Sequence, residues 1–144
     1  MARSRKATVP DVHDLAAALP EVERDPADPS SPARPSYSVR GKTFVFFRGP
    51  RKDAADPQTG DLYEDVMAFH CTPDDKRAMV GDTTSPWFTT PHWDGYNAVL
   101  LLERDIGKVS LDELREVITD AWVVRAPKRL AKEFLASHSG GGQG

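Results

Sequence analysis

The segment Ser36-Tyr37-Ser38-Val39-Arg40-Gly41-Lys42-Thr43-Phe44-Val45-Phe46-Phe47 decides the local fold. Apolar residues recur on both sides of a glycine, as in the two strands of a β-hairpin. A two-residue turn at Gly41 and Lys42 puts glycine at the first central position, as a type II′ turn requires. This register pairs Val39 with Phe44 and Tyr37 with Phe46, so it predicts one shared apolar face.

The predicted hairpin is also basic. Arg40 falls on its opposite face, Lys42 at its tip and Arg48 at the end of its second strand. Residues 34–52 hold six basic side chains and no acid, whereas residues 11–28 hold six acids and one base. Such asymmetry gives a surface a positive and a negative side, although two ordinary solvated faces would look the same. The net charge of −3 by itself argues against strong nucleic-acid binding.

Outward from the hairpin, spacing and turn residues predict the other elements. The predicted helices are one capped by Thr8 and ended by Pro20, one from Pro73 to Gly81, and two over 111–125 and 128–137. The predicted strands lie over 64–71, over 87–90 (short) and over 97–103 (central and buried). The connections are an extended loop over 25–35, a polar connection over 49–63 and a turn over 91–96. This order predicts the α+β class, an antiparallel sheet with helices packed on one face.

Helix signals fix several of these boundaries. Thr72 precedes Pro73 at a helix start, and Ser110 with Glu113 forms an S-x-x-E capping box. Pro127 breaks the helix that starts after Ser110, so this helix ends at Arg125. The chain of 144 residues is then one domain over 9–137, with a disordered start at 1–8 and a flexible Gly-rich tail at 138–144.

No segment indicates a membrane or an oxidising compartment. The apolar runs are far shorter than the roughly 20 residues of a membrane span, and no apolar stretch follows the basic first residues. Cys71 is the single cysteine, which excludes an internal disulfide. We therefore expect a cytoplasmic protein without a secretory signal.

Catalytic motifs are missing from the sequence. Gly41-Lys42-Thr43 lacks the first glycine of a phosphate loop, where Ser36 stands, and precedes a strand instead of a helix. Neither G-x-S-x-G nor E-x-x-H occurs, and His92 with Asp94 gives too few ligands for a metal. We expect no enzyme, no cofactor and no metal site.

Two groups of residues remain as candidate binding sites. The first could bind nucleic acid or another anion, and comprises Arg40, Lys42, Arg48, Arg125, Lys128 and Arg129. The second is a turn that could stack on a ligand or base, with His92, Trp93 and Tyr96. The alternatives are a cationic helix end favoured by the helix dipole, a turn histidine bonded to backbone, and aromatic rings that close the core.

Four segments together resemble the MmcQ/YjbR family of small bacterial proteins. They are residues 18–23 (Ala-Leu-Pro-Glu-Val-Glu), 39–44 (Val-Arg-Gly-Lys-Thr-Phe), 87–96 (Trp-Phe-Thr-Thr-Pro-His-Trp-Asp-Gly-Tyr) and 125–130 (Arg-Ala-Pro-Lys-Arg-Leu). The resemblance covers about residues 9–137 and implies a CyaY-like (frataxin-like) double-wing fold. The family is commonly labelled DNA-binding. The chain departs from the family pattern in its longer 49–63 connection and in Asn97, where proline is usual.

These observations favour a binding module. The first hypothesis is DNA binding, with the hairpin and the basic C-terminal helix gripping phosphates. The second is a binding domain for a small anionic ligand or a protein partner, at the turn that ends in Tyr96 with Arg125, Lys128 and Arg129 nearby. We expect no membrane partner and a monomer.

Overall fold

The computed structural model describes residues 5–26, 35–48, 59–60, 66–82, 84–90 and 95–143, and only the backbone for residues 25, 26, 48 and 138–143. The predicted loop over 25–35 and the connection over 49–63 therefore lie mostly outside the described residues.

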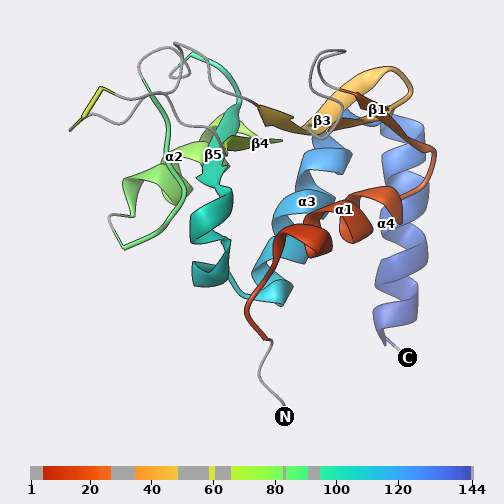
Figure 1. The fold of residues 1–144 in the computed structure, drawn as a ribbon. Helices are drawn as coiled ribbons and strands as arrows, with labels where there is room; N and C mark the ends of the chain where they lie inside the picture. Colours follow the sequence, from red (N-terminus) through yellow and green to blue (C-terminus); the bar gives the residue numbers. More distant parts are fainter. Residues whose placement is uncertain are drawn as a thin grey trace.

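One antiparallel sheet with helices on one side makes up the described fold (Figure 1). The elements are α1 (Val9–Ala17), β1 (Val22–Pro26), β2 (Pro35–Val39), β3 (Lys42–Arg48), β4 (Val66–His70), α2 (Pro73–Gly81), β5 (Ala98–Leu102), the 3₁₀ helix η1 (Glu103–Lys108), α3 (Leu111–Arg125) and α4 (Lys128–Gln143). The strands follow chain order, β1-β2-β3-β4-β5. The predicted α+β class is confirmed, and the CyaY-like double-wing arrangement stays a prediction.

The strand predictions were wrong at both edges of the sheet. Sequence analysis missed β1, which pairs Val22–Pro26 with Pro35–Val39 through backbone bonds although its sequence is mostly polar. The predicted strand over 87–90 is a single bridge between Phe88 and Leu100. β5 is buried as predicted, but it is the last strand in the described sheet instead of a central one.

The hairpin forms with a different turn and register from those predicted. Arg40 and Gly41 both have positive φ, 50° and 82°, which is the type I′ pattern. Val39 pairs with Lys42 and Tyr37 with Val45, and the shift between these pairs leaves Phe44 as the extra residue of a β-bulge. Phe44 and Val45 therefore both reach the core on the helix side of the sheet.

The bulge moves several side chains from their predicted places. Phe46 packs in a smaller cluster on the other sheet face, not beside Tyr37 and Phe44. Arg40 occupies the turn and Lys42 begins β3, so Arg40 is at the tip where Lys42 was expected.

The main core lies between the sheet and α3. Trp122, Tyr37, Phe44, Phe69 and Leu114 are among its fully buried side chains. The predicted stripe of α3 is confirmed for Leu114, Ile118, Ala121 and Trp122, all buried. The alternation predicted for β4 is also confirmed, since Met67 and Phe69 join this core while Val66 and Ala68 face the smaller cluster.

The predicted caps and breaks hold the helices in place. Thr72 Oγ1 accepts the Asp75 N–H at 3.1 Å, and Ser110 Oγ accepts the Glu113 N–H at 3.1 Å. α3 ends at Arg125 and α4 starts at Lys128, on either side of Pro127 as predicted.

Candidate anion-binding surface

Arg125 joins the end of α3 to the hairpin. Its Nε donates a hydrogen bond of 3.0 Å to the carbonyl oxygen of Thr43, 82 residues away in sequence. Trp122 anchors the same helix end, with its Nε1 donating to the Pro20 carbonyl at 3.1 Å. Exposed Lys42, which precedes Thr43, therefore lies at the same corner as Arg125 and the start of α4.

Arg40 is already engaged by an acid. Its Nη2 donates to Glu21 Oε2 at 3.1 Å, and its Nε contacts Glu21 Oε1. The bond to Arg40 lowers the pKa of the Glu21 carboxyl, and the same bond raises the pKa of Arg40. Because the two charges offset each other, Arg40 adds little net charge to the corner. The side chain of Arg48 lies outside the described residues.

Two more predicted cations stand in the first turn of α4. Lys128 and Arg129 are exposed, and Arg129 makes a long ion pair, 3.4 Å from Nε to Glu133 Oε1, with its own side chain 93% exposed. Such exposed pairs contribute little energy, so this charge can be redirected to a ligand. The positive end of the helix dipole adds to the potential at this turn.

Tyr96 lies beside a buried histidine at the end of β4. The two ring centroids, of Tyr96 and His70, are 5.4 Å apart, and Tyr96 is 46% exposed. Burial, and to a smaller extent the charge of Arg125, lowers the pKa of His70 to about 4. His70 is therefore neutral at pH 7. The predicted partners of Tyr96 in this turn, His92 and Trp93, lie outside the described residues.

Sequence reasoning missed the residue that holds the Tyr96 backbone. Lys76 of α2 is buried, and its Nζ donates to the Tyr96 carbonyl oxygen at 2.5 Å. A lysine in the middle of a polar helix carries no sequence signal for burial, because lysine there is normally solvated. His70 carries no sequence signal for a site either, and it is connected with this surface by its ring contact with Tyr96 and by the effect of the Arg125 charge on its pKa.

The described residues give no sign of a metal or thiolate site. Within the described ranges, no three His, Cys, Asp or Glu side chains could hold a metal ion. Burial raises the pKa of the Cys71 thiol to about 11, so it is protonated at neutral pH. None of the helices in the described residues is long and apolar enough to cross a bilayer.

The YjbR family model matches residues 17–124 of this chain. The chain belongs to the YjbR family. Among curated relatives, the uncharacterized proteins Rv2570 of Mycobacterium tuberculosis (strain ATCC 25618 / H37Rv) and Mb2600 of Mycobacterium bovis (strain ATCC BAA-935 / AF2122/97) are each 44% identical over 62 residues, which is 43% of this chain and 46% of the relative. The alignment thus spans about half the length of the curated relatives. No solved structure matches.

The YjbR match divides the candidate surface. It includes the hairpin with Lys42 but ends at residue 124, one residue before Arg125. Lys128 and Arg129 on α4 also lie beyond it. The corner therefore combines one cation inside the matched segment with three cations beyond its end.

Proposed function

We propose that this YjbR chain is a non-enzymatic module that binds the phosphate backbone of DNA. The binding surface is the basic corner, defined here as Lys42, Arg125, Lys128 and Arg129. The observation that carries the proposal is the hydrogen bond from Arg125 Nε to the Thr43 carbonyl oxygen, which brings two basic segments distant in sequence together. Contacts of this kind position a protein on nucleic acid without reading its sequence.

Local charge, more than net charge, supports this surface. The chain carries −3 overall, but in the described part of the chain the acids that pair with predicted cations are Glu21, which holds Arg40 outside the corner, and Glu133, whose pair with Arg129 is long and exposed. Charge-assisted bonds to phosphate are strong compared with neutral ones. Few described groups at the corner could read base edges, so binding should be largely independent of sequence.

Fluorescence anisotropy of labelled duplex and single-stranded DNA tests the proposal, at about 50 and 200 mM salt. We expect binding that weakens steeply with salt. The double variant Lys42→Glu, Arg129→Glu should bind at least tenfold more weakly at low salt. No binding by the unchanged protein at tens of micromolar would contradict the proposal.

A matched control separates the corner from overall charge. Arg77 and Arg115 are exposed on α2 and α3, each in an i,i+3 ion pair, with Asp74 and Asp112 respectively. Arg77→Glu, Arg115→Glu changes the net charge by the same amount away from the corner and should leave binding nearly as strong as in the unchanged protein. Equal losses in both double variants would show that the surface is placed wrongly.

A small anionic ligand is the second candidate, favoured by the group at Tyr96. The His70 ring contacts Tyr96, and Arg125 is near enough to His70 for its charge to lower the pKa of the imidazole. A nucleotide could stack on Tyr96 and place its phosphate near Arg125. Thermal-shift screening of nucleotides and sugar phosphates at millimolar concentration should then raise the Tm, and Tyr96→Ala should abolish the shift. A screen without any stabilising compound would exclude this candidate.

A further inference from the structure

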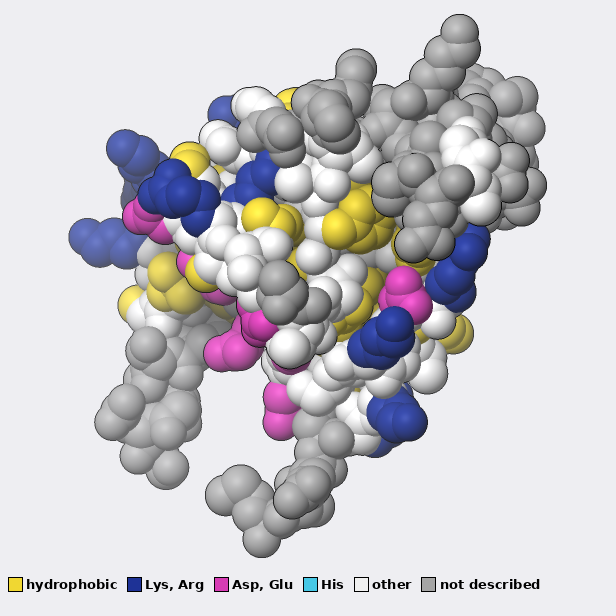
Figure 2. Space-filling view, turned by 90° about the vertical axis from the view of Figure 1, so that its left-hand side faces the viewer, with side chains coloured by type: hydrophobic (Ala, Val, Ile, Leu, Met, Phe, Trp, Pro, Cys, Tyr) yellow, Lys and Arg dark blue, Asp and Glu magenta, His cyan; other side chains and the backbone are white. Residues whose placement is uncertain are grey.

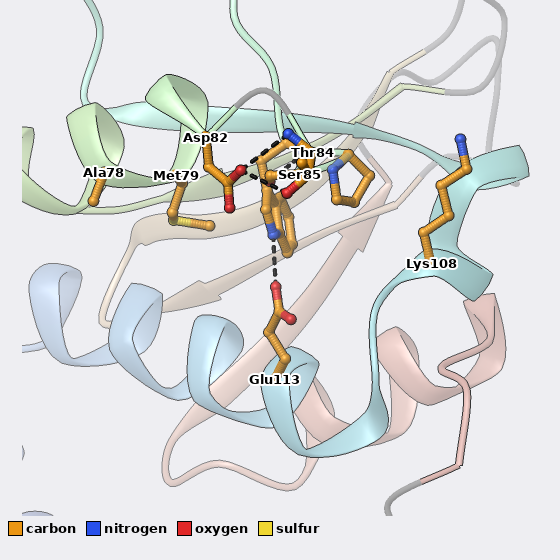
Figure 3. Close-up of a pocket in the computed structure, with 9 residues that line it drawn as sticks. Ala78, Met79, Asp82, Thr84, Ser85, Lys108 and Glu113 are labelled. Atoms are coloured by element: carbon orange, nitrogen blue, oxygen red, sulfur yellow. Dashed lines mark hydrogen bonds between the residues drawn. The ribbon is translucent and has the colours of Figure 1, made fainter.

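A groove between α2 and α3 has the opposite charge from the basic corner. Two adjoining pockets of about 380 and 240 Å³ share Ala78, Met79 and Glu113 in their lining. Figure 2 looks onto this face, where acidic side chains gather beside apolar ones. In Figure 3, Met79 from α2 and Glu113 from α3 approach each other across the larger pocket, with Lys108 apart from them.

The groove combines an apolar floor with an acidic rim. Met79 and Val117 are partly buried against the core, and Trp87 below them is 4% exposed, its Nε1 donating to Glu113 Oε2 at 2.9 Å. The carboxylates of the lining are Asp75, Asp82, Glu113, Glu116 and Asp120. Lys108 is the single cation among the lining residues of these two pockets.

The pKa of Asp120 reports the potential in this groove. Burial raises it first, and the negative charges of Asp75 and Glu116 raise it further. Neighbouring carboxylates thus repel one another across the groove, and a cation placed between them would relieve that repulsion. An isolated metal ion does not fit this description, because no three described acids are close enough to hold one.

We propose that the α2–α3 groove docks a basic amphipathic segment of a partner protein. Its Lys or Arg side chains would pair with the rim, and its apolar side chains would cover Met79 and Val117. Nucleic acid is excluded from the groove by the same acids, so this surface is separate from the basic corner. The proposal does not depend on the proposed DNA binding.

A second copy of this chain is a poorer occupant. α4 has suitable chemistry, with Lys128, Arg129 and Lys132 near the exposed Leu135. However, α2 and α4 lie at opposite sides of the molecule (Figure 1). Copies joined by these two surfaces would add head to tail without closing into a dimer.

Fluorescence anisotropy with three labelled peptides tests the groove. Each peptide has about 18 residues, which is long enough to form an amphipathic face when helical. The probe carries Lys and Leu at helical spacing, one control replaces Lys with Glu, and the other replaces Leu with Ser. We expect the Lys–Leu peptide to bind at least tenfold more tightly than either control. Equal binding of the Lys–Ser peptide would overturn the proposal, because simple charge attraction would then suffice.

Variants locate the binding on the protein. Ala78 is exposed and lines both pockets, so Ala78→Lys puts a cation into the groove without disturbing the core. It should weaken binding of the Lys–Leu peptide at least tenfold. The double variant Asp75→Asn, Glu116→Gln should weaken binding by a similar factor. The matched controls are the single variant Ala17→Lys and the double variant Asp14→Asn, Glu23→Gln. They alter exposed residues of α1 and β1 and should leave the peptide affinity unchanged.

Three results would overturn the assignment. Peptide binding that survives Ala78→Lys would place the binding site outside the groove. An equal loss of affinity in the α1 and β1 controls would show that net charge alone decides the affinity. Sedimentation that reveals self-association, abolished by Ala78→Lys, would assign the groove to a second copy. Thermal unfolding of every variant confirms that each is folded before its affinity is compared.

Discussion

His70 shows at the residue scale how burial sets charge. Its side chain is 5% exposed and contacts the rings of Phe46 and Tyr96, with centroid distances of 6.2 and 5.4 Å. Burial first, and then the charge of Arg125, lowers its pKa from 6.5 to about 4. The folded protein therefore resists protonation at a position where the unfolded chain does not.

This shift predicts a loss of stability in mild acid. As the pH falls from 6.5 towards 4, the unfolded chain binds a proton at His70 and the folded chain does not, so the free energy of unfolding should fall by about 2 kcal/mol. Urea unfolding at several pH values measures it. His70→Gln should flatten the curve in this window, and an unchanged slope in that variant would contradict the assignment.

Asp11 adds a further loss of stability in stronger acid. Its carboxylate accepts bonds from Arg5 Nη2 at 2.6 Å and from the Thr8 N–H at 2.8 Å, and these bonds hold its pKa well below the usual range. The stabilisation is present above pH 3.8 and is lost as the pH falls below it. Asp11→Asn should cost about 1 kcal/mol at pH 7. Thermal unfolding should show this difference shrinking near pH 2, and a constant difference would rule out the charged pair as its source.

The turn between β2 and β3 is decisive at the element scale. Gly41 has φ +82°, and a Cβ built there would meet nothing within 4 Å. Gly41→Ala should therefore lower the free energy of unfolding by about 1–2 kcal/mol, through backbone strain alone. Gly81→Ala is the control, since its site at the end of α2 is equally open without positive φ. Chemical denaturation of both variants measures the difference, and equal effects would contradict the turn assignment.

α3 connects the two charged surfaces. Its earlier turns place Glu113, Glu116 and Asp120 at the acidic groove, while Arg125 ends the helix at the basic corner. This polarity agrees with the helix dipole, which favours acids near the N-terminus and cations near the C-terminus. One helix thus carries most of the core contact and separates the opposite charges.

At the scale of the whole molecule, the basic corner should act as a single electrostatic surface. Removing two phosphate contacts with Lys42→Glu, Arg129→Glu should reduce the slope of log K against log salt by about 1.8 for duplex DNA. Affinities measured at four or more salt concentrations give this slope. A lower affinity with an unchanged slope would mean that the variants disturb the fold and not the phosphate contacts.

Much of the molecule could be predicted from local sequence. Helix starts at Thr72 and Ser110 and the break at Pro127 were predicted correctly, because caps and proline act within one turn of the chain. The buried stripe of α3 and the alternation of β4 were predicted from their periodicity. The YjbR family was predicted from four short motifs and confirmed by the family model.

The remaining features depend on contacts between distant segments. β1 has few apolar residues and is a strand only because β2 offers it backbone partners, and the bulge at Phe44 fits two adjacent side chains into one core. Among the candidate site residues, the sequence supplied the cations. It could not show that Glu21 forms an ion pair with Arg40, or that the buried Lys76 binds the carbonyl oxygen of Tyr96.

The sequence by itself determined the helices, most of the strands, the family and the supply of basic residues, because these follow from local periodicity and motif chemistry. The tertiary structure decided which charges act together. Packing of α3 against β3 sets Arg125 on Thr43 and gathers the acids of α2 and α3 in one groove. Electrostatic potential depends on distance in space, and only the folded chain fixes that distance.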